Sequence, residues 1–125
     1  MALVLDTSAI SAFMHGSLAV GEILTEIDDD HGAALIPLPC LIEAAALYPD
    51  GHAWIDVLLA HPTTVVISDN PEDWRMVANL RLILGGYEPA FAAWLALEAD
   101  VDVMTRNADL YTKLDGGSFT LPFDD

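Results

Sequence analysis

The sequence predicts an α/β fold, in which a mainly parallel sheet of four to five strands is covered by helices on both faces. Short apolar stretches alternate with segments of helical periodicity along the whole chain. Some of these stretches carry no charge, as in ALVL at residues 2–5, which is typical of strands buried on both sides of a parallel sheet. With 125 residues and no linker, repeat or low-complexity tract, one domain spanning residues 1–125 is expected.

The first half of the chain contains two predicted strands and four predicted helices. Residues 2–5 and 33–36 (AALI) have the length and apolar composition of buried strands. Thr7 or Ser8 is a suitable N-cap for the first helix, and the acidic run DDDHG ends the second one. The helical segments are Ala9–Met14, Ser17–Ile27, residues 40–48 after two prolines, and His52–Ala60.

The second half continues the alternation of strands and helices. The run TTVVI at residues 63–67 is β-branched throughout and is therefore the strongest strand signal in the chain. A helix follows within residues 68–86, because Pro71 stands near its start and Gly85–Gly86 provide a stop. The remaining elements are a helix at Glu88–Ala99 that is apolar on nearly every side and hence buried, a strand at Val101–Met104, and a short strand at Ser118–Leu121.

Charge is the most unusual bulk property of the chain. It has 20 acidic residues against four basic ones, a formal net charge of −16. Such a surface repels nucleic acid unless something neutralises it, and it favours metal cations or a basic protein. A merely solubilising acidic surface is the other interpretation. No apolar run reaches the roughly 20 residues of a membrane span, and MALVLDT is not a signal peptide. We therefore expect a soluble cytoplasmic protein with no membrane partner.

The predicted topology gathers several polar side chains at one edge of the sheet. Binding sites in open parallel α/β sheets lie beyond the carboxyl ends of the strands, where the following helices begin. Asp6 follows the first strand, and Glu43 lies early in the helix after the second strand. Glu43 is the sole formally charged residue between His31 and Pro49, so it needs a cation, a salt bridge or an edge position in water. The other side chains expected there are Glu88, Thr105, Arg106, Asn107 and Asp109.

Three motifs occur together in a characteristic order. These are LDTSAI, the apolar helix LIEAAAL with its lone glutamate, and a second apolar helix that leads to VMTRNADLY. The set resembles the PIN-domain family, particularly the VapC-type toxin ribonucleases of prokaryotic toxin–antitoxin pairs. The resemblance implies a PIN-like three-layer α/β/α fold and a ribonuclease that uses Mg²⁺ or Mn²⁺ to hydrolyse phosphodiester bonds. It also implies an RNA substrate, a small basic antitoxin as partner and a possible homodimer.

The resemblance assigns roles residue by residue. Asp6 corresponds to the first acid of the family, and Glu43 corresponds to the second. Pro89 stands where the third acid usually begins its helix, and Glu88 lies one residue earlier. The family's T-R-D is here Thr105-Arg106-Asn107, with Asp109 two residues on. The implied catalytic residues are Asp6, Glu43, Glu88, Asn107 and Asp109; the implied metal ligands are Asp6, Glu43, Glu88 and Asp109; and the supporting residues are Thr7, Ser8, Thr105 and Arg106.

Two other interpretations of the chain stay open at this point. One is a catalytically degenerate PIN-fold protein that acts as a binding or regulatory module, and the other is an unrelated acidic α/β domain. Several other residues have simpler interpretations. The four histidines lack metal-ligand spacing, and Cys40 is either a small buried residue or a reactive thiol. The three tryptophans, Trp54, Trp74 and Trp94, are more often core or interface anchors than base-stacking platforms.

Overall fold

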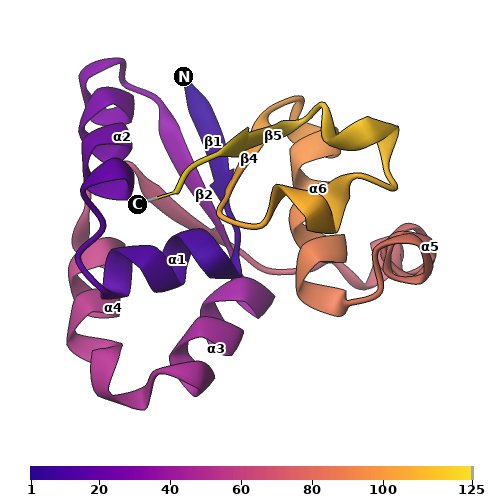
Figure 1. Ribbon diagram of the computed structural model, residues 1–125, viewed down its shortest axis with the longest axis horizontal. Helices are drawn as coiled ribbons and strands as arrows, with labels where there is room; N and C mark the ends of the chain where they lie inside the picture. Colours follow the sequence, from indigo (N-terminus) through magenta and orange to yellow (C-terminus); the bar gives the residue numbers. More distant parts are fainter. Residues whose placement is uncertain (125) are drawn as a thin grey trace.

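The computed structural model describes residues 1–124 and forms a three-layer α/β/α arrangement (Figure 1). Five strands form one sheet in the order β3-β2-β1-β4-β5, and every neighbouring pair is parallel. The predicted parallel sheet with helices on both faces is therefore confirmed. The strands are β1 (Ala2–Leu5), β2 (Ala33–Pro37), β3 (Thr64–Ile67), β4 (Asp102–Thr105) and β5 (Thr120–Pro122).

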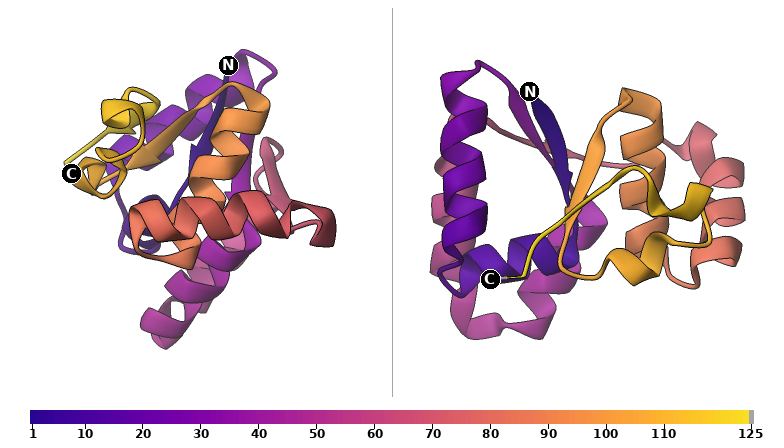
Figure 2. Two further views of the ribbon diagram at one scale, coloured as in Figure 1. Left: turned by 90° about the vertical axis from the view of Figure 1, so that its right-hand side faces the viewer. Right: turned by 45° about the horizontal axis from the view of Figure 1, so that its top comes forward.

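Six helices cover the sheet within the described residues. α1, α2 and α4 lie on one side, α6 packs on the other side, and α5 packs on the outside of α6 (Figures 1 and 2). α3 begins directly at the end of β2 and packs between α1 and α6. The helices are α1 (Thr7–Met14), α2 (Leu18–Asp29), α3 (Leu38–Leu47), α4 (His52–Ala60), α5 (Trp74–Leu84) and α6 (Tyr87–Ala99).

The core is built around the central strand β1. Leu3, Val4 and Leu5 are buried, because β1 is paired on both sides and covered on both faces. α6 was expected to be a buried helix, and six of its residues, including Phe91, are buried. Leu97 on its outer face is nevertheless half exposed. No helix within residues 1–124 is both long enough and apolar enough to cross a membrane.

One local expectation needs correction. Asp6, rather than Thr7 or Ser8, is the N-cap of α1, and its carboxylate accepts a hydrogen bond from the backbone N–H of Ala9. The strand predicted from the β-branched run is confirmed as β3, Thr64–Ile67, which lies at the edge of the sheet, where Val65 and Val66 are both exposed. A continuous β-branched run indicates a strand, but its place in the sheet depends on which strands pair beside it.

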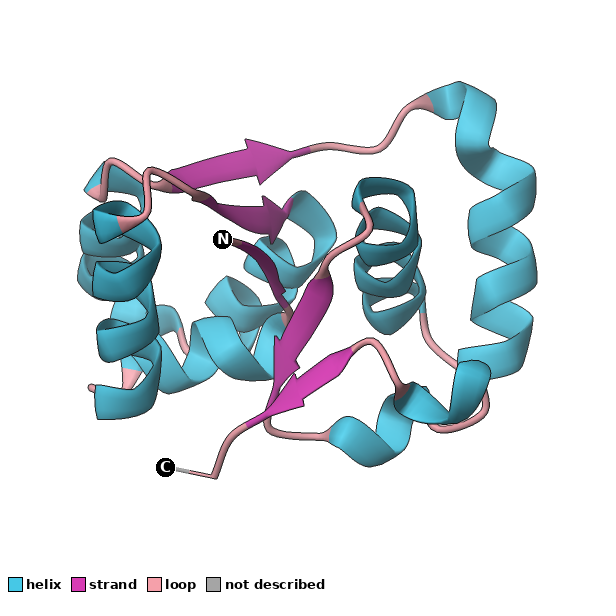
Figure 3. Ribbon diagram, turned by 90° about the horizontal axis from the view of Figure 1, so that it is seen from above, coloured by secondary structure: helices cyan, strands magenta, loops and turns pink. Residues whose placement is uncertain are grey.

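The topology brings the carboxyl ends of the strands to one edge of the sheet (Figure 3). β1 ends immediately before Asp6, β2 leads directly into α3, and β4 ends immediately before Arg106. The N-termini of α1 and α3 begin at the same edge, so polar side chains that are far apart in sequence share one region.

Candidate functional site

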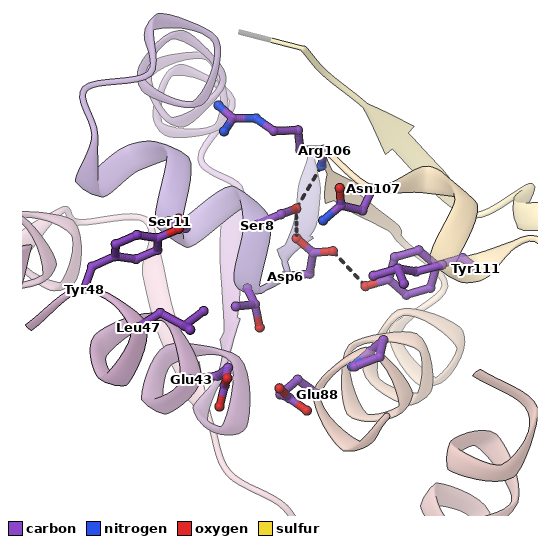
Figure 4. Close-up of a pocket in the computed structure, with 13 residues that line it drawn as sticks. Asp6, Ser8, Ser11, Glu43, Leu47, Tyr48, Glu88, Arg106, Asn107 and Tyr111 are labelled. Carbon is purple, nitrogen blue, oxygen red and sulfur yellow. Dashed lines mark hydrogen bonds between the residues drawn. The ribbon is translucent and has the colours of Figure 1, made fainter. Parts of the chain in front are cut away.

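A pocket of about 360 Å³ opens at the carboxyl edge of the sheet, between α1, α3 and α6. Three acidic side chains from different elements line it, namely Asp6, Glu43 and Glu88 (Figure 4). This is the convergence that the sequence predicted. The other lining residues are Thr7, Ser8, Ser11, Leu47, Tyr48, Pro89, Arg106, Asn107, Leu110 and Tyr111.

Asp6 is held by three hydrogen bonds and is 3% exposed. Its Oδ1 accepts from the Ser8 hydroxyl at 2.6 Å and from the Ala9 backbone N–H at 3.1 Å. Its Oδ2 accepts from the Tyr111 phenol at 2.8 Å. A carboxylate offers about four acceptor positions, so these donors leave about one position, on Oδ2. Asp6 is therefore a helix cap that keeps limited capacity to bind a cation.

Ser8 links the end of β4 to the start of α1. Its hydroxyl hydrogen is used on Asp6, so in the 3.3 Å contact with Thr105 the Thr105 hydroxyl is the donor. Ser8 Oγ also accepts from the Arg106 backbone N–H at 2.9 Å, and Thr105 Oγ1 accepts from the Asn107 backbone N–H at 2.9 Å. Ser8 and Thr105 thereby fix the backbone that carries Arg106 and Asn107.

Glu43 and Glu88 lie across the pocket from each other, on α3 and on the first turn of α6 (Figure 4). Both are half-buried. Neither side chain has a hydrogen bond or an ion pair with any residue in the described part of the chain. The salt bridge considered for Glu43 is accordingly not formed among residues 1–124. Two carboxylates without partners at a pocket wall make the region strongly attractive to cations.

Cys40 connects α3 to the start of α6 beneath these glutamates. Its thiol donates to the Glu88 backbone carbonyl over 3.5 Å and is buried. Burial, more than the nearby Asp6 and Glu88 charges, raises the pKa of the Cys40 thiol to about 12. A protonated, buried thiol is a poor nucleophile, which confirms the interpretation of Cys40 as a small buried residue. Thr7 Oγ1 is buried beside it and has no hydrogen-bond partner among the described residues.

The residues present offer oxygen donors suited to Mg²⁺ or Mn²⁺, but they are not gathered into a finished site. Carboxylates from Asp6, Glu43 and Glu88 and the Asn107 amide are hard ligands of the kind these ions prefer. Within residues 1–124, however, no three acidic, histidine or cysteine side chains lie close enough to hold one ion together. Asp6, Glu43 and Glu88 are the acidic side chains that would face a metal in this pocket, and water and substrate phosphate would have to complete its coordination, as they usually do for magnesium.

The remaining predicted residues are placed unevenly. Asn107 lines the pocket, whereas Asp109 is exposed in a short 3₁₀ turn, Ala108–Tyr111, and does not line it. Arg106 lines the pocket and is exposed, with its guanidinium 5.4 Å from the Phe123 ring centroid. The expectation that Asp109 is a metal ligand finds no support in this placement, because the 3₁₀ turn directs Tyr111 inward instead.

Tyr111 is the functional residue that sequence reasoning missed. It is fully buried, packs edge-on against Phe119, and donates to Asp6. Burial first, and then the Asp6 charge and hydrogen bond, raise the pKa of its phenol far above the ordinary value. Nothing in the motif VMTRNADLY distinguishes this tyrosine from an aromatic residue that only packs in the core. The structure is needed to show that its hydroxyl reaches Asp6.

Comparisons with known proteins support the fold alone. Neither a family model nor a curated protein sequence matches the chain. The crystal structure of PAE2754 from Pyrobaculum aerophilum is similar, with a TM-score of 0.62, 19% sequence identity, and coverage of 96% of this chain and 92% of that one. The likeness spans nearly the whole of both chains, so the complete α/β/α architecture occurs in a solved structure.

Proposed function

We propose that this protein is a metal-dependent ribonuclease that hydrolyses RNA phosphodiester bonds and is the toxin of a toxin–antitoxin pair. One observation carries the proposal: Asp6, Glu43 and Glu88, from three separate elements, line one open pocket together with Asn107. The resemblance of LDTSAI, LIEAAAL and VMTRNADLY to PIN-domain ribonucleases supports the same reading.

The pocket residues have distinct tasks in this proposal. Asp6 presents one oxygen from a fixed position, because Ser8, Ala9 and Tyr111 hold its carboxylate. Glu43 and Glu88 supply negative charge that no described cation neutralises, and Arg106 at the pocket attracts the substrate phosphate. When bound, Mg²⁺ or Mn²⁺ lowers the pKa of a water molecule and offsets charge that develops on the phosphate.

Metal titration calorimetry combined with RNA cleavage tests the proposal. We expect the wild-type chain to bind Mn²⁺ and to cleave single-stranded RNA only with the metal present. Asp6→Asn and Glu43→Gln should lose both properties. Glu22→Gln, on the exposed face of α2, removes one carboxylate far from the pocket and should retain both. No heat of binding at millimolar Mn²⁺, with no metal-dependent cleavage, contradicts the proposal.

A second candidate is a PIN-like binding or regulatory module without catalysis. Two observations favour it: the described acidic side chains form no cluster of three, and Asp6 is already bonded to three donors. A module of this kind would bind its partner equally well with Mg²⁺ and with a chelator. The titration described above therefore separates the two candidates.

The charge of −16 bears on which partner binds more tightly. With four basic residues the chain pairs with few phosphates, so RNA alone should bind poorly. A basic antitoxin is steered by the acidic surface, and one of its arginine or lysine side chains can occupy the pocket in place of the metal. We expect such a partner to bind more tightly than RNA both at about 0.05 M and at about 0.3 M salt. Added metal should weaken the binding of this partner, because both would occupy the acidic pocket. Tight, metal-free RNA binding without partner binding contradicts this expectation.

A homodimer remains part of the proposal. Leu82 on α5 is 80% exposed, and a second copy of the chain would cover this apolar side chain. Sedimentation of the wild type and of Leu82→Glu tests this assignment. A monomer in both samples contradicts it.

A further inference from the structure

A second pocket, of about 390 Å³, adjoins the acidic one and is lined by aromatic rings. We call it the aromatic pocket; its rings are His15, Tyr48 and Trp54. Tyr48 and Leu47 line both pockets. Leu47 lies one helical turn beyond Glu43 on α3, which is about 6 Å along the helix axis. The two pockets therefore follow one another along α3.

The rings of the aromatic pocket are exposed and held in place. Tyr48 is 39% and Trp54 49% exposed, although large aromatic side chains are usually well covered. His15 stands perpendicular to Tyr48 with ring centroids 4.6 Å apart, and its Nδ1 lies 2.7 Å from the Ser11 carbonyl oxygen. Trp54 contacts Phe13 edge-on at 6.3 Å. Trp54 is thus not a core anchor, one of the two roles expected for it.

Charge distinguishes the two pockets. Three acidic residues line the first pocket, whereas Asp50 is the one acidic residue among the described lining of the aromatic pocket. A strongly acidic protein gains little RNA affinity from phosphate contacts. Stacking of bases on aromatic rings needs no positive charge, since every base has a π-face. An exposed aromatic surface next to the acidic pocket can therefore bind RNA by stacking, where the few basic residues of the chain provide little affinity through ionic contacts to phosphate.

We propose that the aromatic pocket binds an unpaired base of the RNA, stacked on Tyr48 and Trp54, next to the phosphate that occupies the acidic pocket. This inference rests on the proposed ribonuclease function and adds a base-binding site beside the acidic pocket. A base within a duplex has both faces covered by its neighbours, so it cannot stack on these rings.

Trp54 fluorescence provides a direct test in the full-length chain. In a Trp74→Phe/Trp94→Phe background, the remaining tryptophan reports on the aromatic pocket. We expect a single-stranded oligoadenylate to quench its emission, in the presence of Mg²⁺ and more weakly with a chelator. The same sequence in duplex form should leave the emission unchanged.

Matched variants show whether stacking accounts for the affinity. Tyr48→Ala and Trp54→Ala should each raise the dissociation constant for the single strand about tenfold or more, from the usual worth of one stacked base. Tyr48→Phe and Trp54→Phe keep a ring and should bind nearly as the wild type does, which controls for folding. Trp74→Ala removes another exposed tryptophan, on α5 and 63% exposed, and should have no effect.

The outcomes separate this inference from the proposed function. Metal-dependent cleavage without quenching overturns the stacking site and leaves the ribonuclease intact. Quenching and tenfold losses without cleavage support the stacking site and contradict the ribonuclease. Quenching by a basic peptide but not by RNA overturns the inference and assigns the aromatic pocket to a protein partner.

Discussion

The phenol of Tyr111 donates a hydrogen bond to Oδ2 of Asp6 across 2.8 Å, although 105 positions separate the two residues. Both are buried, at 0% and 3% exposure. The bond joins the 3₁₀ turn after β4 to the end of β1 and holds the carboxylate that lines the acidic pocket. Any change at either residue should therefore affect both the stability of the fold and the properties of the pocket.

Tyr111→Phe should destabilise the chain by about 2 kcal/mol near neutral pH, because it removes a buried hydrogen bond to a charged group. The variant should also lose less stability than the wild type when the pH is raised above neutral. The folded state raises the pKa of Tyr111, so the stabilisation is complete below about pH 10, the pKa of an unfolded tyrosine, and is lost as the pH rises above it.

Urea denaturation of the wild type and the variant between about pH 7 and 11 measures both effects. Tyr87→Phe is the control. Its phenol donates to the exposed Asp69 at 2.8 Å, so we expect a change below about 1 kcal/mol near neutral pH. Burial and Asp69 raise the pKa of Tyr87 to about 12, so Tyr87→Phe should also lessen the loss of stability at alkaline pH. If the free energy of unfolding falls equally with pH in the wild type and in Tyr111→Phe, ionisation of Tyr111 is not the cause of the alkaline loss of stability.

Substitutions at Asp6 should separate its structural role from its charge. Asp6→Ala removes the cap of α1 and leaves the Tyr111 hydroxyl without its acceptor, so we expect a loss of about 2–4 kcal/mol. Asp6→Asn keeps the capping oxygen and removes a buried charge. Its amide NH2 replaces the oxygen that accepts from Tyr111, so that hydrogen bond must reverse or be lost, and Asp6→Asn should cost about 1–2 kcal/mol when metal is absent, less than Asp6→Ala.

Thermal unfolding with and without Mn²⁺ tests this pair of variants. Ser17→Ala, which removes the side chain that caps α2, should cost about 1 kcal/mol and serves as the reference for a helix cap. If Asp6→Ala is no worse than Ser17→Ala, the bonds to Ser8 and Tyr111 contribute little.

Two glycines should respond oppositely to alanine. A Cβ on Gly32 would overlap the carbonyl oxygen of Met1, so Gly32→Ala must displace the start of β1 and should destabilise by about 1–3 kcal/mol. Gly21 lies inside α2 with nothing within 4 Å of an added Cβ, so Gly21→Ala should stabilise by about 0.5–1 kcal/mol. Chemical denaturation of both variants tests the contrast. Similar effects of the two changes would be inconsistent with the close approach at Gly32.

The C-terminus of α2 should respond to salt. Asp28, Asp29 and Asp30 are exposed where the helix ends, and the last turn contains no basic residue. Negative charge is unfavourable at a helix C-terminus, so Asp29→Asn should stabilise by about 0.3–1 kcal/mol at low salt. The gain should vanish near 1 M salt, where the Debye length is about 3 Å. A gain that persists at high salt points to a cause other than charge.

Cys40 should resist alkylation in the native protein. Its thiol is buried and its pKa is raised to about 12, so iodoacetamide should react much more slowly below that pH than with the urea-unfolded chain. Mass spectrometry of timed samples measures the two rates. Rapid native modification would mean that α3 and α6 separate readily.

Local signals along the sequence determined the elements and their class. Apolar runs without charge specify β1 and β2, and helical spacing with prolines, glycines and capping residues specifies the helices to within a few residues. The arrival of Asp6, Glu43 and Glu88 at one pocket follows from parallel topology alone, since every parallel strand ends at the same edge.

The tertiary structure decided what depends on contacts between distant segments. The run at residues 63–67 has the strongest strand signal, yet it forms the edge strand β3, because pairing order is a property of the whole sheet. Tyr111 and Asp109 are two positions apart in sequence, but the 3₁₀ turn buries the first against Asp6 and leaves the second exposed. Residue type and spacing determine the local preference for helix or strand. The contact between two side chains that are distant in sequence forms only when folding closes the loop between them.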